Sequence, residues 1–318
     1  MSDGKKQHGW RNAIIIAVVI LVVIITPLLI YASADIEKKD LDDAARTQQG
    51  GSYVKLPDGI THYELTGPET GQVVVLVHGM SVPMYGWDAQ VEPLMQAGFR
   101  VLRYDMFGKG YSDRPEADYS LAFYRKQLFD LLNTLKIQQP VDLVGHSLGA
   151  GVVIDFTANY AERVKDIVLI APMMNYENES SIKPFKPPVL GEFLVRLIGT
   201  KILADRAAQG VQKSPRADEY AKLFKEQMQY KGFARAMLAM FRGDAMADHT
   251  ANYLTVGKQG KKVMLIWGTL DDNIKSQMVK DIRTTLPGVN YQELEAVGHF
   301  SQVEVPDKIN SLVIDFLK

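Results

Sequence analysis

The stretch VDLVGHSLGAGVVIDF, residues 141–156, is apolar, then glycine-rich around one serine, then apolar again. This order predicts a buried strand that turns sharply into a helix, with Ser147 at the turn. Gly145 and Gly149 flank the serine, and glycines permit a tight turn and close packing of the helix. Such a turn pushes the serine side chain out of the sheet. Glycines beside a serine also occur by chance, so the assignment of a nucleophile depends on the rest of the chain.

Apolar runs on both sides of this turn alternate with helical patterns. Residues 52–67 hold a Pro-Asp-Gly turn between two β-rich arms, which predicts a hairpin. Continuous apolar runs predict strands buried on both faces, and they lie at 73–79, 99–108, 141–145, 166–173 and 261–268. A further strand is expected within 289–299, and helices over 119–135 and 306–318. Strands that alternate with helices predict an α/β fold with a mostly parallel sheet and helices on both faces.

The alternation stops between residues 174 and 260, where helical signals occur without a buried strand. We expect this segment to be a helical cap inserted into the α/β core. The core then has two parts, 52–173 and 261–318. Residues 35–51 are charged and then glycine-rich, which is typical of a linker, and residues 1–34 form an anchor with a short tail.

The anchor is predicted from residues 13–34, which are uncharged and long enough to cross a ~30 Å hydrocarbon core as a helix. Ala32-Ser33-Ala34 looks like a signal-peptidase site, but the apolar run up to Tyr31 exceeds the 7–15 residues usual for a cleaved signal. We therefore favour an uncleaved membrane anchor over a cleaved signal, and over a buried core helix.

The side of the membrane on which the catalytic domain lies is a separate question. Basic residues are balanced on the two sides of the apolar run, with Lys5, Lys6 and Arg11 before it and Lys38, Lys39 and Arg46 after it. A first apolar segment after a short basic stretch behaves as a signal-anchor, with its N-terminus in the cytoplasm. We expect the catalytic domain on the outer face, which is periplasmic in a bacterium.

Composition excludes several classes of site. The net charge is −1 and no basic block occurs, so nothing indicates a nucleic-acid partner. The absence of cysteine excludes a cysteine nucleophile, a thiolate metal site and a disulfide framework. There is no HExxH motif and no histidine cluster, so no metal or other cofactor is expected. The sequence leaves the oligomeric state open.

A serine hydroxyl needs a base, and the base works best when a carboxylate orients it. In hydrolases with this type of turn the chain order is serine, acid, histidine. Only His249 and His299 follow the serine, and His249 lies in the helical segment. His299 lies just beyond the last strand, at the edge where open α/β sheets place their sites. We expect His299 to be the base.

The acid is expected in the loop after the preceding strand, which contains Asp271 and Asp272. We prefer Asp271, and Asp272 would then cap a helix or face solvent. Glu177 and Glu179, after an earlier strand, are a more distant alternative.

Acyl transfer also requires donors for the developing oxyanion. The backbone N–H groups expected to supply them belong to Leu148, directly after the nucleophile, and to Met80, in the loop after residues 73–79. We expect His78 to hold that loop through backbone hydrogen bonds, and His146 to be a packing residue of the turn.

Five segments together carry a resemblance to a known family. In order they are HGMSVPMYGW (78–87), YDMFGKGYSDRP (104–115), VGHSLGAG (144–151), WGTLDD (267–272) and VGHFSQVEVPDKINSLVIDFL (297–317). They look like the α/β-hydrolase fold superfamily, in its serine esterase- or lipase-like branch. The resemblance runs from about Ser52 to the C-terminus, and residues 174–260 resemble the family's cap or lid. We assign no chemistry to Asp105, which belongs to a structural turn.

Departures from the family's patterns narrow the activity. Relatives that open epoxides or carbon–halogen bonds typically use an aspartate followed by tryptophan, whereas this chain has Ser147-Leu148. The HGGPG motif of proline iminopeptidases is absent. The resemblance implies a serine hydrolase of carboxylic esters, with monoacylglycerol- or lipid-like esters favoured as the small-molecule substrate. The alternatives are an acyltransferase or perhydrolase, a carbon–carbon bond hydrolase, and a non-catalytic binding protein.

Apolar residues of the cap are expected to line an acyl pocket. They are Phe193, Leu197, Phe224, Met228, Met237 and Phe241. The alternative is that they only pack the cap onto the core.

Overall fold

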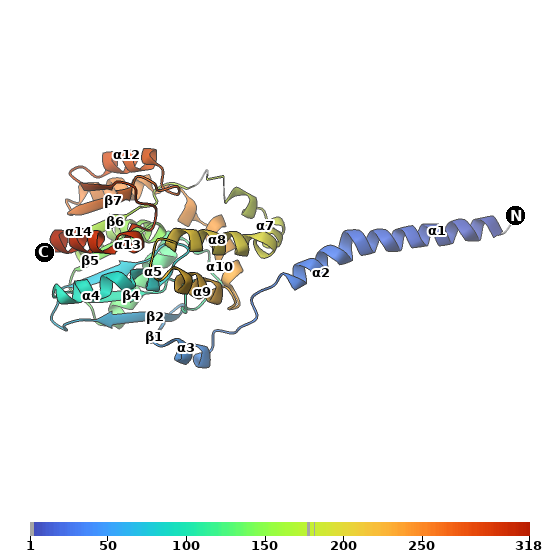
Figure 1. Ribbon diagram of the computed structural model, residues 1–318, viewed down its shortest axis with the longest axis horizontal. Helices are drawn as coiled ribbons and strands as arrows, with labels where there is room; N and C mark the ends of the chain where they lie inside the picture. Colours follow the sequence, from blue (N-terminus) through green and yellow to red (C-terminus); the bar gives the residue numbers. More distant parts are fainter. Residues whose placement is uncertain (1–2, 177–178, 181) are drawn as a thin grey trace.

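The apolar runs of the chain come together in one eight-stranded sheet, ordered β1-β2-β4-β3-β5-β6-β7-β8 (Figure 1). The structure is a computed structural model and describes residues 3–176, 179–180 and 182–318. The strands are β1 (Ser52–Leu56), β2 (Gly59–Thr66), β3 (Val73–Val77), β4 (Arg100–Tyr104), β5 (Val141–His146), β6 (Val164–Ile170), β7 (Val263–Gly268) and β8 (Asn290–Leu294). Strand β2 pairs antiparallel with both β1 and β4. All other neighbouring strands, from β4 through β3 to β8, pair in parallel.

The sheet follows from the sequence pattern. Leu56 pairs with Gly59, so the two residues between them form the tight turn of the predicted hairpin. Every residue of β3, β5 and β7 is buried, as expected for strands covered on both faces. The predicted α/β fold with a mostly parallel sheet is confirmed.

Helices cover the sheet in two groups, and the helices of each group contact one another. The first group is α4 (Asp88–Gln96), α13 (Ser301–Glu304) and α14 (Pro306–Leu317), drawn in front of the sheet in Figure 1. The second group is α5 (Leu121–Thr134), α6 (Leu148–Asn159), α11 (Thr250–Lys258) and α12 (Ser276–Thr285). The residues that follow the carboxyl ends of β3, β5, β7 and β8 form the site described below.

The described part of the segment between β6 and β7 consists of helices joined by turns and loops, with isolated β-bridges at Asn175 and Tyr230. Its elements are η4 (Lys183–Phe185), α7 (Leu190–Leu194), η5 (Val195–Gly199), α8 (Thr200–Val211), α9 (Ala217–Gln227), α10 (Phe233–Arg242), η6 (Asp244–Met246) and α11. Helices α7, η5 and α8 form one uninterrupted helical run. The last helix, α11, packs on α6 and α12 of the core. We call the elements from η4 to η6 the cap.

The N-terminal part is a helix that projects away from the rest of the molecule (Figure 1). It consists of α1 (Asp3–Ile20), η1 (Leu21–Ile25) and α2 (Thr26–Ser33). The stretch Trp10–Ser33 is long and apolar enough to cross a membrane, and none of its most apolar part is buried against the protein.

The segment 35–51 contains the short helix α3 (Asp43–Gln49) and lies against the cap and the core. The backbone N–H of Lys39 donates to the carbonyl of Gln229, and the N–H of Lys231 donates to the carbonyl of Lys39. The Arg46 guanidinium, whose side chain is 9% exposed, pairs with the Asp113 carboxylate. This linker therefore packs against the domain at Lys39 and at Arg46.

Candidate active site

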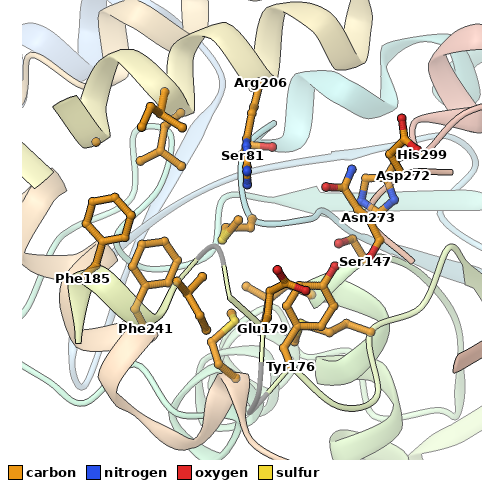
Figure 2. A pocket seen from close by; sticks show the side chains of 18 of the residues that line it. Ser81, Ser147, Tyr176, Glu179, Phe185, Arg206, Phe241, Asp272, Asn273 and His299 are labelled. Atoms are coloured by element: carbon orange, nitrogen blue, oxygen red, sulfur yellow. Dashed lines mark hydrogen bonds between the residues drawn. The ribbon is translucent and has the colours of Figure 1, made fainter. Parts of the chain in front are cut away.

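Ser147 stands at the junction of β5 and α6. Its φ of 54° and ψ of −117° lie in a region that residues with a side chain rarely adopt. The conformation is held by its neighbours, because the Ser147 N–H donates to the Ile170 carbonyl at 3.0 Å and the Ser147 carbonyl accepts from the Ala150 N–H at 3.1 Å. The turn directs the half-buried side chain into a cavity above the sheet (Figure 2).

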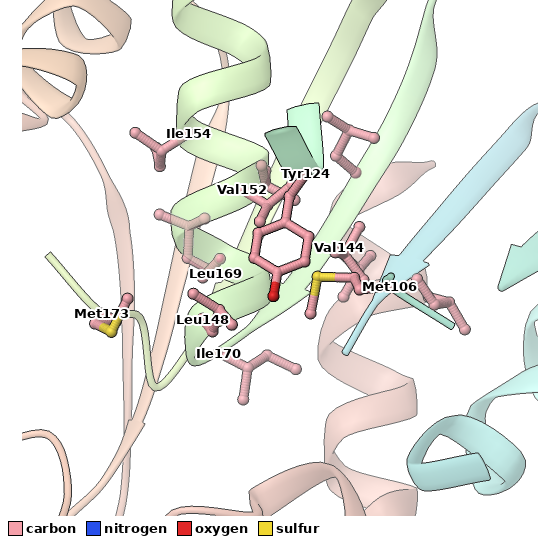
Figure 3. Packing of buried hydrophobic residues seen from close by; sticks show 14 of the residues in the cluster. Met106, Tyr124, Val144, Leu148, Val152, Ile154, Leu169, Ile170 and Met173 are labelled. Carbon is pink, nitrogen blue, oxygen red and sulfur yellow. The ribbon is translucent and has the colours of Figure 1, made fainter. Parts of the chain in front are cut away.

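The turn rests on a close-packed apolar base (Figure 3). Leu148 and Val152 of α6 are fully buried, and so are the ends of β5 and β6 at Val144 and Ile170. An added Cβ at Gly149 would lie 2.3 Å from the Val77 carbonyl oxygen, so only glycine lets α6 approach β3 this closely. Packing from several directions therefore fixes the unusual backbone of the serine.

His299 and Asp271 meet at the same end of the cavity. His299 follows β8 and Asp271 follows β7, and the imidazole Nδ1–H donates to Asp271 Oδ2 at 2.9 Å. The other carboxylate oxygen accepts the backbone N–H groups of Asn273 and Ile274, both at 2.8 Å. The Asp271 side chain is fully buried and the His299 side chain is 10% exposed. In the neutral imidazole the lone pair then belongs to Nε2, and Figure 2 draws the His299 ring beside Ser147.

The other candidate acids and the other candidate base make different contacts, although Asp272 also lines the cavity. The Asp272 side chain is fully exposed and lies 3.9 Å from Lys275 Nζ. Glu179 lines the cavity wall, and Glu177 lies outside the described residues. His249 Nε2 donates to the Asp244 carbonyl at 2.8 Å, away from the residues that line the cavity.

Two backbone N–H groups beside the serine have no hydrogen-bond acceptor within the described chain, those of Met80 and Leu148. Both residues line the cavity. The loop of Met80 reaches the serine because its neighbour is a glycine: an added Cβ at Gly79 would lie 3.3 Å from the Cβ of Ser147. The two donors can therefore serve an oxygen atom placed above the serine hydroxyl.

Two buried histidines support these loops through hydrogen bonds to the backbone. His78 Nδ1 donates to the Gly79 carbonyl at 2.7 Å, and its Nε2 accepts the Met106 N–H at 2.9 Å. The predicted role of His78 in holding its loop is confirmed, and burial lowers its pKa to about 4. His146 Nε2 donates to the His299 carbonyl at 2.9 Å. Burial, together with the nearby His299, holds the pKa of His146 well below its usual value.

The cavity has a volume of about 350 Å³ and lies between the carboxyl ends of the parallel strands and the cap. Its cap side is mostly apolar and is lined by Ile182, Phe185, Val195, Ile202, Leu203, Phe241 and Met246. Charged and polar groups line the rest of the wall, among them Arg206, Lys275, Asn273 and Tyr176. An apolar chamber with a few polar groups at one end is typical of a small-molecule site.

Of the six cap residues predicted to line a pocket, Phe241 lines this cavity. The other five lie elsewhere, at Phe193, Leu197, Phe224, Met228 and Met237. Phe224, Met228 and Met237 are at most 2% exposed and belong to the main hydrophobic cluster. Phe193 stacks on Tyr31, with ring centroids 5.9 Å apart.

Several lining residues were not singled out in the sequence. Asn273 and Lys275 follow Asp271, and Phe300 follows His299, so their neighbours could have indicated them. Ile202 and Arg206 come from α8, and no sequence signal separates them from other helix residues. The part of the chain that the structure describes contains no cluster of three metal-ligating side chains.

Comparison with known proteins agrees with this architecture. A family model described as "alpha/beta hydrolase fold" matches residues 72–306. The chain is 26% identical over 282 residues to the AB hydrolase superfamily protein YfhM of Bacillus subtilis (strain 168), and the match covers 82% of this chain and 96% of the relative.

Two further similarities concern enzymes. The chain is 24% identical over 311 residues to bifunctional epoxide hydrolase 2 of Sus scrofa, a match that covers 84% of this chain and 55% of that protein. The crystal structure of the enol-lactonase from Burkholderia xenovorans LB400 superposes with a TM-score of 0.72 at 22% identity, covering 84% of this chain and 99% of the other. At this identity the structural likeness shows the fold alone.

Proposed function

The chain belongs to the α/β-hydrolase fold family and is a hydrolase of that family, and from this premise we propose that it cleaves carboxylic esters through Ser147, His299 and Asp271. One observation carries the proposal. The imidazole Nδ1 lies 2.9 Å from Asp271 Oδ2, and its ring and the strained serine border one cavity. An epoxide-opening mechanism of the usual kind would need a carboxylate nucleophile where this chain has the serine hydroxyl.

The first half of the proposed reaction acylates the serine. Ser147 Oγ attacks the ester carbonyl carbon while His299 Nε2 takes the hydroxyl proton. The carbonyl oxygen becomes an oxyanion that accepts the N–H groups of Met80 and Leu148. The intermediate collapses when the carbon–oxygen bond to the alcohol breaks, and the imidazolium returns its proton to the departing alkoxide. Asp271 stabilises the imidazolium and keeps the proton on Nδ1.

The second half releases the acid. Water attacks the acyl carbon and gives a proton to His299 Nε2, and the same two N–H groups hold the new oxyanion. The carbon–oxygen bond to Ser147 then breaks, and the serine oxygen regains its proton from the imidazolium. One water is consumed, and one acid and one alcohol are produced.

The shape of the cavity supports an ester with an apolar chain. The wall formed by Phe185, Ile202, Leu203 and Phe241 offers no charge, and apolar surface removed from water contributes roughly 25 cal/mol per Å² to binding. Methionine, present at Met246, adapts to chains of different length. We therefore favour monoacylglycerol- or lipid-like esters.

The assignment is tested on the full-length protein in detergent with a fluorophosphonate probe, which forms a covalent bond with an activated serine. The wild type should be labelled, and Ser147→Ala should not. Ser81→Ala is the matched control, because Ser81 lines the same cavity and should leave labelling intact. Labelling that survives in Ser147→Ala contradicts the assignment of the nucleophile.

The substrate class is tested with esters of graded chain length. Turnover that rises from acetate toward longer acyl chains agrees with the apolar wall, and turnover that falls steadily contradicts a lipid-like substrate. Product analysis with an added alcohol separates hydrolysis from acyl transfer, because a transferase yields the new ester in place of the free acid.

We also propose that Trp10–Ser33 is a retained membrane anchor and that the catalytic domain lies on the outer face. The length and the apolar character of this helix support the anchor. Protease added to intact spheroplasts should then digest the catalytic domain. Protection until the membrane is broken would place the domain in the cytoplasm, and release into the soluble fraction would mean cleavage after Ala34.

A further inference from the structure

Apolar side chains are exposed along one side of the helical run α7–η5–α8. Leu190, Ile198 and Ile202 are 51%, 48% and 39% exposed, and Val189, directly before the run, is 81% exposed. The residues between them that face the protein, such as Val195, are buried. We call Val189, Leu190, Ile198 and Ile202 the cap stripe. Large contiguous patches of exposed apolar side chains mark sites of interaction with proteins or membranes.

The N-terminal helix ends on this same helical run. The ring of Tyr31 stacks on Phe193, with centroids 5.9 Å apart, and the Arg196 guanidinium lies 4.2 Å from the Tyr31 ring centroid. Arg196 also pairs with the Asp35 carboxylate at 3.5 Å. Figure 1 shows α2 and α7 at the same end of the molecule. A bilayer that holds the N-terminal helix therefore lies on the side of the cap.

Contacts of the linker hold the N-terminal helix near the cap, in addition to the stacking of Tyr31 on Phe193. The Glu37 carboxylate accepts the N–H groups of Gly232 at 2.7 Å and Ala234 at 2.5 Å, where α10 begins. An acid at a helix N-terminus is stabilised by the unpaired N–H groups there. Together with the backbone bonds of Lys39, these contacts hold the linker against the cap.

The charges around the stripe fit a lipid surface. Lys183 is exposed and Lys186 is half-buried, just before Val189. The acids on the run, Glu192 and Asp205, are paired with Arg242 and Lys201. Basic side chains near a membrane are attracted to anionic headgroups. Apolar side chains flanked by lysines are the pattern of surfaces that insert into the headgroup region.

We propose that the cap stripe inserts into the interfacial region of the bilayer that holds the N-terminal helix, and that the ester passes from the lipid directly into the cavity. Ile202 belongs both to the stripe and to the cavity lining, so the cavity wall borders the inserted surface. The substrates are then amphiphilic esters already dissolved in the membrane. This inference rests on the proposed ester hydrolysis and on the proposed anchor.

Insertion is tested by the depth of single labels in the full-length protein. Because the chain has no cysteine, Val189→Cys and Ile198→Cys each give one labelling site for an environment-sensitive fluorophore. Leu254→Cys is the matched control, an apolar residue 44% exposed on α11. The protein is placed in vesicles of phosphatidylcholine and phosphatidylglycerol that carry a lipid-bound quencher.

Labels at 189 and 198 should be quenched, and the label at 254 should not. Equal quenching at all three positions, or none at 189 and 198, overturns the proposal. Energy transfer between labels on different copies without lipid quenching would show that a second copy of the chain covers the stripe.

Passage of substrate is tested with Val189→Glu and Ile198→Glu, neither of which lines the cavity. A charge in the interface opposes insertion, so turnover of a long-chain ester in vesicles should fall about tenfold. Turnover of a short water-soluble ester should not change, and Leu254→Glu should affect neither. An unchanged ratio of the two rates overturns the proposed route. If the wild type hydrolyses neither ester, the proposed function fails, and the quenching result still decides whether the stripe is inserted.

Discussion

Asp271 accepts one hydrogen bond from His299 and two from the backbone of its own turn. Asp271→Asn can keep the backbone bonds through its amide oxygen. The amide NH₂ group would then face Nδ1 and favour the wrong tautomer of the imidazole. We expect kcat to fall by roughly 10³–10⁴-fold, measured with a chromogenic ester under saturating conditions.

The neighbouring residue provides the control for that measurement. The side chain of Asp272 is fully exposed, and its carboxylate lies 3.9 Å from Lys275 Nζ. Asp272→Asn should therefore change kcat far less than Asp271→Asn. The opposite ranking would assign the acid to Asp272 and contradict the 2.9 Å pair as the working arrangement.

Lys109 is a buried amine without a carboxylate partner among the described residues. Its amine donates to the Tyr124 hydroxyl at 3.0 Å, and burial lowers its pKa to about 7. In the unfolded chain the pKa is about 10.4. Between these values the unfolded state binds a proton that the folded state lacks, so Lys109 makes stability rise with pH by up to about 1.4 kcal/mol per unit.

Lys109→Met removes this dependence. The free energy of unfolding of the variant should exceed that of the wild type by the largest amount at pH 7 and below. There the folded wild type must bury the charged amine of Lys109. This excess should decline as the pH rises toward 10. Urea unfolding of both proteins at pH 7 and pH 9.5 measures the difference, and a difference that does not change with pH would contradict this account.

Helix α6 approaches the sheet most closely at its first glycine. A methyl group at Gly149 would lie 2.3 Å from the Val77 oxygen and 2.5 Å from the His78 oxygen, and both are backbone atoms. Gly149→Ala must push α6 away from β3 and shift Ser147. We expect a loss of about 1–3 kcal/mol of stability together with most of the turnover, measured by thermal unfolding and ester hydrolysis.

Gly151 on the same helix is the matched control, because its nearest neighbour to an added Cβ is 3.6 Å away. Gly151→Ala should be neutral or stabilise the protein by up to about 1 kcal/mol. If the two variants behaved alike, close packing at Gly149 would not be what positions the turn.

The core elements could be predicted because their signals are local. The run Val73–Val77 is apolar at every position, and Val141–His146 is apolar at Val141, Leu143 and Val144. Both runs are the pattern of a strand covered on both faces. The Pro-Asp-Gly turn gave the hairpin in the same way. The strand order and the contact between Asp271 and His299 depend on long-range packing, and motif order alone anticipated that contact.

The cavity lining could not be predicted in the same way. Helical spacing marks Phe224, Met228 and Met237 as buried, which they are, but it does not say which neighbour buries them. Those side chains pack into the hydrophobic core. The actual wall includes Ile202 of α8, and its position depends on how the cap folds over the sheet.

The contacts between the linker and the domain predict how the folded protein responds to a protease. Arg46, a trypsin site by residue type, is held by the carboxylates of Asp43 and Asp113. Trypsin must open this contact before it can cleave, so cutting after Arg46 should be slow in the folded protein. Asp113→Asn should accelerate it several-fold, as followed by mass spectrometry.

The exposed ion pair between Asp58 and Lys126 supplies a control that lies outside the linker. Asp58→Asn should leave cleavage after Arg46 unchanged. Rapid cleavage in the wild type, equal to that in Asp113→Asn, would mean that residues 35–51 form a free tether.

On the proposed anchoring, a catalytic domain that is joined to the N-terminal helix through fixed contacts stays at one height above the bilayer. On the proposed route it meets its substrate in two dimensions, where the effective concentration is set by the membrane and not by the surrounding volume. Its rate then obeys surface dilution. Mixing inert lipid into the vesicles lowers turnover in proportion to the mole fraction of the ester, whereas diluting the same vesicles with buffer leaves turnover per enzyme unchanged.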